Sequence, residues 1–377
     1  MAKNVRVIAG QKSWRLAASL VEAFITQTGG HLAPVTFNVA GRKIQPYSVA
    51  PWWNEKVDPK LPNILKVLRG DFFCMPFGSC TEPYKGEMHP LHGETANRAW
   101  TLQMLEKDGP VMALHCTMQT KVRPTRVDKL MTVIDGDPAI YSRHVISGAK
   151  GPMTIGHHPC LKMTSPGVMS FSKFDFGQVY GQPVETPENL GYSILQPGAV
   201  FEKLEKVPII TGEMADVSRY PARRGFEDIV LLANDRKLPF AWSAVTFPQE
   251  RAVWLARKDP RVVPCTMLWM SNGGRHYAPW SSRHLDVLGV EEICGNYFEG
   301  LAPSARKNPL SARGVPTTVM LSEKTPTVVN YVMAMAAVPA GFDAVARIEP
   351  LDGGQFVELI ARNGKRAKVS VDVSFLL

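Results

Sequence analysis

The chain of 377 residues carries 43 Lys and Arg against 34 Asp and Glu, a formal net charge of +9. With 45% hydrophobic and 20% charged residues, its composition is typical of a globular protein with a sizeable core. No apolar stretch suits a signal peptide or a membrane span, and the basic residues are dispersed. We therefore expect no membrane or nucleic-acid partner, and the excess charge favours a small anionic substrate instead.

The six cysteines are scattered, with no Cys-x-x-Cys pair and no metal-ligand spacing. In a chain of this size they indicate free thiols in a reducing compartment, so we expect a cytoplasmic protein. No linker, change of composition or repeat divides the sequence. A single domain over residues 1–377 is the simplest prediction.

Long helical patterns are scarce. Apolar residues at helical spacing predict a helix over Trp14–Thr28, and a short one is expected over Pro62–Arg69. Elsewhere, 30 glycines and 30 prolines divide the chain into short segments. Strands are expected at Val111–Val122, Ala139–Ser147, Val207–Thr211, Ile229–Leu232, Ala241–Phe247, Thr317–Leu321, Val328–Met333, Ala344–Ile348, Phe356–Arg362 and Ala367–Phe375.

The last two of these strands flank Asn363-Gly364, a pair typical of tight hairpins. Val328–Pro339 is also compatible with a helix. Many strands, few helices and no strand–helix alternation predict an all-β fold, a large antiparallel β-sandwich with a few short helices.

The stretch Pro90–Trp100 combines side chains suited to a ligand site. His92 can transfer protons near neutral pH, and Gly93 lets the backbone pass close to a ligand. Arg98 and Trp100 add hydrogen-bond donors and a flat apolar face, which a sugar ring requires. A structural turn with a capping histidine is the alternative interpretation.

The segment Leu268–Trp280 is rich in aromatic, glycine and polar residues. Such a segment either anchors long loops in the core or forms a platform for sugars, whose C–H faces stack on aromatic rings. On the second interpretation, Trp269, Arg275 and Trp280 are candidate substrate-binding residues.

The histidine pairs do not predict a metal site. His157 and His158 would point to opposite faces of a strand, and no Asp, Glu or Cys stands at ligand spacing. The sequence also lacks a serine nucleophile elbow, a Walker loop and a dinucleotide motif. Acid–base chemistry by histidines and carboxylates is the remaining option.

Two carboxylate pairs have suggestive positions: Glu227 and Asp228 follow a basic loop, and Glu291 and Glu292 end an apolar strand. Either pair could instead be a solvated strand end or an ion pair with a nearby arginine.

Four segments carry a family resemblance. His92-Gly93, with Ala96, Arg98 and Trp100 after it, resembles the His-Gly segment of the aldose 1-epimerases, or mutarotases. His158-Pro159 is similar to the family's second histidine, Gly225–Asp228 to its Gly-Tyr-Asp-His segment, and Leu288–Glu291 to its late strand ending in the catalytic glutamate. The order along the chain is the family's, and the resemblance spans roughly residues 35 to 375. Ser79 stands where the family has an early arginine.

The resemblance implies the galactose mutarotase-like β-sandwich and opening and closing of a sugar ring without a cofactor. Glu291 would be the base that takes the O1 proton, His158 the acid, and His92 the residue that holds O1 or the ring oxygen. Because a second glutamate follows Glu291, the base could also be Glu292 if the register shifts by one residue.

Substrate binding would fall to Arg98, Glu227, Asp228, Trp269 and Arg275. We therefore expect an aldose 1-epimerase-like isomerase that acts on a small sugar or a sugar phosphate. A non-catalytic sugar-binding protein of the same fold is one alternative. A carbohydrate hydrolase or lyase with paired carboxylates, such as Glu227 and Glu291, is another.

An anionic sugar would be favoured if arginines point into the cleft. The candidates are Arg219, Arg223 and Arg224, which precede Glu227, together with Arg275. The alternative is that these arginines pair with neighbouring carboxylates.

Overall fold

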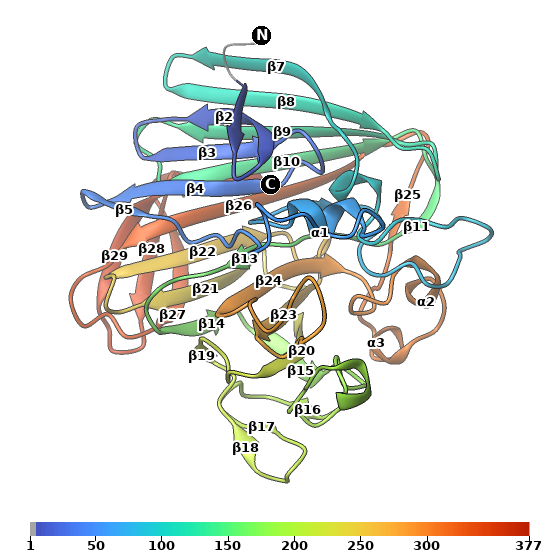
Figure 1. Cartoon of the computed structure of the whole chain (residues 1–377). Coiled ribbons are helices and arrows are strands. Elements are labelled where there is room, and N and C mark those ends of the chain that lie inside the picture. Colours follow the sequence, from blue (N-terminus) through green and yellow to red (C-terminus); the bar gives the residue numbers. More distant parts are fainter. Residues whose placement is uncertain (1–4, 377) are drawn as a thin grey trace.

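The computed structural model describes residues 5–376, and antiparallel sheets form most of it (Figure 1). The largest sheet has nine strands, in the spatial order β19 (Arg219–Tyr220), β14 (Gly167–Phe171), β21 (Ala241–Phe247), β22 (Ala252–Lys258), β26 (Thr327–Ala337), β10 (Ala139–Ser147), β9 (Arg126–Ile134), β8 (Val111–Gln119) and β7 (Thr101–Asp108).

A second sheet of eight strands carries the residues of interest for function. Its order is β16 (Val200–Phe201), β15 (Phe174–Val179), β20 (Phe226–Asn234), β23 (Cys265–Asn272), β24 (Val287–Cys294), β12 (Ile155–His157) and β6 (Phe73–Cys74), with β13 (Cys160–Leu161) also pairing with β24.

Smaller sheets complete the structure. The N-terminal sheet consists of β1 (Val5–Ile8), β2 (Gln11–Ala17), β3 (Val21–Thr26), β4 (Leu32–Val39) and β5 (Arg42–Ile44), and the C-terminal sheet of β27 (Val345–Leu351), β28 (Phe356–Ala361) and β29 (Arg366–Ser370). Two further pairs join β11 (Gly151–Met153) to β25 (Val319–Leu321) and β17 (Val207–Pro208) to β18 (Met214–Ala215).

In the part of the chain that the structure describes, helices are few and short. They are α1 (Asn63–Val67), α2 (Leu301–Ser304), α3 (Pro309–Ala312) and four 3-10 turns at Glu94–Ala96, Pro187–Asn189, Asp352–Gly354 and Ser374–Leu376. Within residues 5–376, no helix has both the length and the apolar character needed to cross a membrane.

The two large sheets share one core. Side chains alternate along β20, so Val230 and Leu232 join a core that includes Trp254 of the nine-stranded sheet. Ile229 and Leu231 point to the other face of the eight-stranded sheet, into a second core. We call this second face the outer face; loops and α1 cover it, and the candidate site lies there.

The predicted all-β sandwich is confirmed, including the short helix α1 and the hairpin at Asn363-Gly364, where Gly364 has a φ of +83°. The strands predicted at Ala139–Ser147 and Ala241–Phe247 have the observed bounds. Of the two options for Val328–Pro339, the strand is observed.

Several local predictions differ from the structure; among them, the strand expected at Val111–Val122 ends at Gln119, and the one expected at Thr317–Leu321 begins at Val319. The helix predicted over Trp14–Thr28 is wrong, because this segment forms the hairpin β2–β3, which buries Trp14 and Leu16 on one face by alternation. The strand expected at Val207–Thr211 extends only over Val207–Pro208, and the strand expected at Ala367–Phe375 ends at Ser370.

Candidate active site

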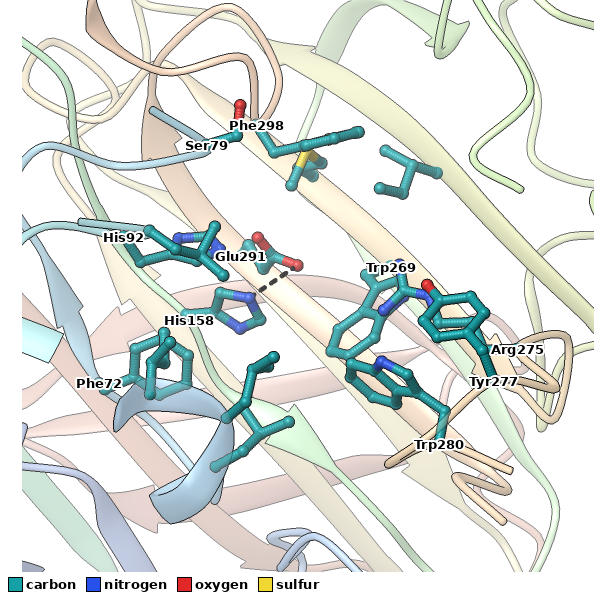
Figure 2. Close-up of a pocket in the computed structure, with 16 residues that line it drawn as sticks. Phe72, Ser79, His92, His158, Trp269, Arg275, Tyr277, Trp280, Glu291 and Phe298 are labelled. Atoms are coloured by element: carbon teal, nitrogen blue, oxygen red, sulfur yellow. Dashed lines mark ion pairs between the residues drawn. The ribbon is translucent and has the colours of Figure 1, made fainter. Parts of the chain in front are cut away.

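A cavity of about 340 Å³ lies on the outer face of the eight-stranded sheet (Figure 2). Strands β20, β23 and β24 contribute lining side chains such as Ile229, Met267 and Glu291. His158, which directly follows β12, and His92, which precedes the turn Glu94–Ala96, reach the same cavity. Segments far apart in the sequence therefore meet at one place.

His158 and Glu291 face each other inside the cavity, with Nε2 of the histidine 3.4 Å from Oε1 of the glutamate (Figure 2). The imidazole stacks on Phe72, with ring centroids 4.5 Å apart, and its Nδ1 lies 3.4 Å from Sγ of Cys160. Oε2 of Glu291 is buried without a hydrogen-bond partner among the described residues. A buried carboxyl oxygen without a partner can complete its hydrogen bonding with a ligand.

Burial determines the protonation of this pair. Desolvation raises the pKa of Glu291 well above its ordinary value and lowers the pKa of His158 well below its ordinary value, and the nearby His92 lowers the latter further. Both shifts favour the neutral forms, with the transferable proton of the pair on Glu291. The sequence-based expectation placed the same proton on His158, because it assumed an ionised glutamate.

His92 approaches His158 edge to face, with ring centroids 5.1 Å apart. The backbone N–H of Gly78 donates to its Nδ1 at 3.3 Å, which places the proton of the neutral ring on Nε2. Burial lowers the pKa of His92 to about 3, so the ring is a neutral hydrogen-bond donor at physiological pH.

Two glycines make room for the site. His92 and Gly93 both have positive φ values, +56° and +77°, and a Cβ on Gly93 would lie 2.0 Å from the carbonyl oxygen of Met75. A Cβ on Gly289, two residues before Glu291 in β24, would lie 2.8 Å from the glutamate Oε1. Steric constraints thus explain why glycine follows His92 and why glycine stands two residues before Glu291 in β24.

Glu292 points to the opposite face of β24, into the core between the two large sheets. Its Oε2 forms an ion pair with Nζ of Lys258 and accepts a hydrogen bond from Thr266 at 2.7 Å, and its Oε1 accepts one from Ser243 at 2.6 Å. Glu292 therefore does not line the cavity, and of the two glutamates only Glu291 does.

His157 and His158 are also neighbours in the sequence whose side chains point to opposite faces of the sheet. Nδ1 of His157 lies 2.8 Å from Oδ2 of Asp71 and its ring stacks on Tyr331 of the nine-stranded sheet. The other oxygen of Asp71 accepts the backbone N–H of His158 at 3.0 Å. Asp71 thus connects the cavity side of this segment to the interior side.

Trp269, Arg275, Tyr277 and Trp280 form the wall across from His92 (Figure 2). The guanidinium of Arg275 lies 4.5 Å from the ring centroid of Trp280 and 5.4 Å from that of Trp269. Its Nε donates to Oε1 of Glu185 at 2.6 Å, and Tyr277 donates to the same oxygen at 2.9 Å.

Glu227 lies behind this wall. Its two oxygens accept hydrogen bonds from Nε1 of Trp269 at 3.0 Å and from the hydroxyl of Ser271 at 2.9 Å, and Nε of Arg275 is 4.0 Å away. Desolvation raises the pKa of Glu227 to about 7, although Arg275 and both hydrogen bonds oppose the shift. Glu227 holds the tryptophan, and its own oxygens are occupied.

Two of the expected substrate contacts lie away from the cavity. Asp228 follows Glu227 in β20 and points the other way, where its Oδ1 accepts the backbone N–H groups of Ile194 and Leu195. Arg98 pairs with Glu94 at 2.5 Å at the edge of the 3-10 turn. Both side chains have structural partners.

Several residues that line the cavity or support its lining were not predicted. Tyr277 stands two residues after Arg275 in the aromatic segment, a signal that could have indicated it. Nothing in the sequence indicates Glu185, which reaches Arg275 from 90 residues away, or Phe72, on which His158 stacks.

Within residues 5–376, no group of three or more His, Cys, Asp or Glu side chains is arranged to hold a metal ion.

Solved structures of similar fold are found although the sequences differ strongly. They include a proposed aldose 1-epimerase from Escherichia coli K12 (13% identity, TM-score 0.56, 87% of this chain and 100% of that chain covered). A galactose mutarotase-like protein from Clostridium acetobutylicum (11%, 0.56, 88% and 98%) and a galactose mutarotase related enzyme from Lactobacillus acidophilus (9%, 0.51, 86% and 97%) are similar as well. No protein-family model and no curated protein sequence matches the chain.

The fold is thus the galactose mutarotase-like β-sandwich. At identities of 9–13% this similarity concerns the fold. The chemistry has to be argued from the site itself.

Proposed function

We propose that this protein is an aldose 1-epimerase-like isomerase, which interconverts the α and β anomers of an aldose. The observation that carries the proposal is the buried His158–Glu291 pair, which lines the cavity and in which one carboxyl oxygen has no hydrogen-bond partner among residues 5–376. Trp269 and Trp280 supply the aromatic surface on which a sugar ring can stack.

The reaction requires one proton to leave O1 and one to reach the ring oxygen O5. In the neutral pair, His158 takes the O1 proton while Glu291 gives its carboxyl proton to O5, and the C1–O5 bond breaks to leave an aldehyde. Rotation about C1–C2 presents the other face of C1, and ring closure reverses both transfers. Because O1 and O5 are bonded to the same carbon, two groups 3.4 Å apart are well spaced for them.

His92 would donate from Nε2 to O1 or O5 and stabilise the charge that develops there. Ser79 lines the cavity at the position where the family has an arginine. His92 is therefore the group best placed to act as a neutral donor in this chain.

A neutral sugar suits the cavity better than a sugar phosphate. The charge of Arg275 is compensated by Glu185 at 2.6 Å and by Glu227 at 4.0 Å. Arg219 pairs with Asp216 and is largely exposed. The excess positive charge of the chain is therefore not concentrated at the candidate site.

The test uses pure α anomers of several neutral aldoses, followed by NMR or polarimetry with and without the protein. We expect interconversion faster than the spontaneous rate and proportional to protein concentration. Binding without acceleration would support the sugar-binding alternative. Release of a new reducing end from a glycoside would support a hydrolase, in which Glu291 acts with a second carboxylate.

A further inference from the structure

The cavity differs from a sugar site lined by hydrogen-bonding groups, because one side of it is aliphatic. Ile64 and Leu65 of α1, together with Leu68 just after it, line the cavity, and Leu91 and Met267 add further apolar surface. These apolar side chains offer no hydrogen-bond partner of ordinary strength to a sugar hydroxyl.

The aliphatic wall is held in place. Nε1 of Trp52 donates to the carbonyl oxygen of Leu65 at 2.7 Å, and the side chain of Asn97 accepts the backbone N–H of Ile64 at 2.9 Å. The edge of Trp52 packs against Trp280, with ring centroids 4.8 Å apart. The wall is therefore part of the built cavity.

Hydrogen-bonding side chains in the cavity are few. His92, His158 and Glu291 are engaged with O1 and O5 in the proposed reaction. Ser79, Arg275, Tyr277 and Trp280 remain, and all four lie outside α1. Nε of Arg275 and the hydroxyl proton of Tyr277 are already donated to Glu185, and the Ser79 hydroxyl lies 3.4 Å from the carbonyl oxygen of Glu299.

An aldohexopyranose has four hydroxyls besides O1 and O5, and none of the hydrogen-bonding side chains of the cavity belongs to α1. A hydroxyl placed against Ile64, Leu65 and Leu68 would lose its hydrogen bonds to water without replacement. A methyl group placed there would instead be removed from water.

We propose that the substrate is a 6-deoxyaldose, a neutral sugar whose exocyclic arm ends in a methyl group that contacts the α1 wall of Ile64, Leu65 and Leu68. This inference rests on the proposed function and adds the substrate class to it. Deoxygenation at C6 creates the largest apolar group that removal of one hydroxyl from an aldohexose can give. A cavity of about 340 Å³ is also near the lower end of the range for small-molecule sites, as a monosaccharide requires.

The experiment compares three sugar pairs that differ only at O6: D-fucose with D-galactose, D-quinovose with D-glucose, and L-rhamnose with L-mannose. Dissociation constants come from NMR titration and anomer exchange rates from the same samples. We expect at least one 6-deoxy sugar to bind roughly 5- to 150-fold more tightly than its parent, the range that corresponds to an unpaired buried hydroxyl.

Leu65→Gln tests the wall, because Leu65 is only half-buried and the longer polar side chain can reach O6. It should reduce the preference for the 6-deoxy sugar by several-fold. Leu190→Gln is the matched control, since Leu190 is 60% exposed and lies outside the cavity, and it should leave the preference unchanged.

Equal or tighter binding of every parent hexose overturns the inference, and so does a protein that binds none of the six sugars. A preference that Leu65→Gln leaves intact also overturns the role of the wall. One result would contradict the proposed reaction alone. If a 6-deoxy sugar binds more tightly than its parent but its anomers exchange no faster than in the absence of protein, the isomerase activity is contradicted while the proposed ligand class stands.

Discussion

Two neighbouring carboxylates in β24 show the difference between a functional and a structural acid in this molecule. Glu292 lies between the sheets, with an ammonium group and two hydroxyls as partners. Glu291 is equally buried on the outer face, but one of its oxygens has no partner among the described residues, and the other lies 3.4 Å from His158.

The comparison teaches that burial alone does not identify a reactive group. A buried carboxylate with all its hydrogen bonds satisfied maintains the fold, and one that is left incomplete at a cavity can complete its bonding with a ligand. Glu227 is an intermediate case, since it is buried beside the cavity but bonded to Trp269 and Ser271.

The largest expected effect is on the outer face. His158→Asn should lower the rate of anomer exchange by about 10²- to 10⁴-fold, because the pair loses one of its two proton-transfer groups. The measurement is exchange spectroscopy at saturating sugar. His115→Asn in β8, where His115 pairs with Asp128 away from the cavity, is the control and should retain activity. Equal losses of the exchange rate in both variants would contradict the assignment of the reaction to the cavity on the outer face.

On the interior face, Glu292→Gln should act on stability. It leaves the ammonium of Lys258 buried without a counter-charge, so we expect a decrease of about 3–5 kcal/mol in the free energy of unfolding, measured in urea. The control is Glu202→Gln at an exposed position. A loss below 1 kcal/mol would show that Lys258 does not depend on this carboxylate.

The pH dependence of the free energy of unfolding tests Glu227, the intermediate case in this comparison. Its folded-state pKa, about 7, lies above the ordinary 4.5, so its stabilising contribution is complete below pH 4.5 and is lost as the pH rises through 7. Glu227→Gln removes this dependence. Between pH 4.5 and 7, the stability of the wild type should therefore fall relative to the variant by about 1–3 kcal/mol. A difference independent of pH would contradict the raised pKa.

The smallest expected effect is steric. Gly289→Ala places a methyl group 2.8 Å from Oε1 of Glu291, which has to move away from His158, so exchange should slow by roughly 10-fold. Gly181→Ala is the matched control, because a Cβ there meets nothing within 4 Å. An unchanged rate in Gly289→Ala would mean that the position of the carboxylate is not critical.

Much of the fold could be predicted because strand patterns and turns are local. The strand-forming residues of Ala139–Ser147, among them Ile140, Tyr141 and Val145, and the Asn363-Gly364 turn carry their own signals. The hairpin β2–β3 could not be predicted, since its apolar residues also fit helical spacing. Only packing against the sheets distinguishes a hairpin from a helix here. The single-domain organisation and the cytoplasmic location stay predictions.

The site was predictable where chemistry and order along the chain coincide, as for His92, His158 and Glu291, which the structure brings to one cavity. Their catalytic roles stay proposals. Asp228 was expected beside a substrate, but the alternation of β20 directs it away from Glu227. The aliphatic wall of α1 could not be predicted, because it depends on tertiary contacts such as Trp52 with Leu65.

The most direct test compares Glu291→Gln and Glu292→Gln at equal folded fraction, with anomer exchange and sugar affinity measured by NMR on the same samples. The change of a carboxylic acid to an amide is identical in the two variants, and only the face of β24 differs. We expect Glu291→Gln to lose at least 100-fold in exchange rate while binding the sugar, and Glu292→Gln to keep the wild-type rate per folded molecule. Full activity in Glu291→Gln, or loss of activity in folded Glu292→Gln, would contradict the account.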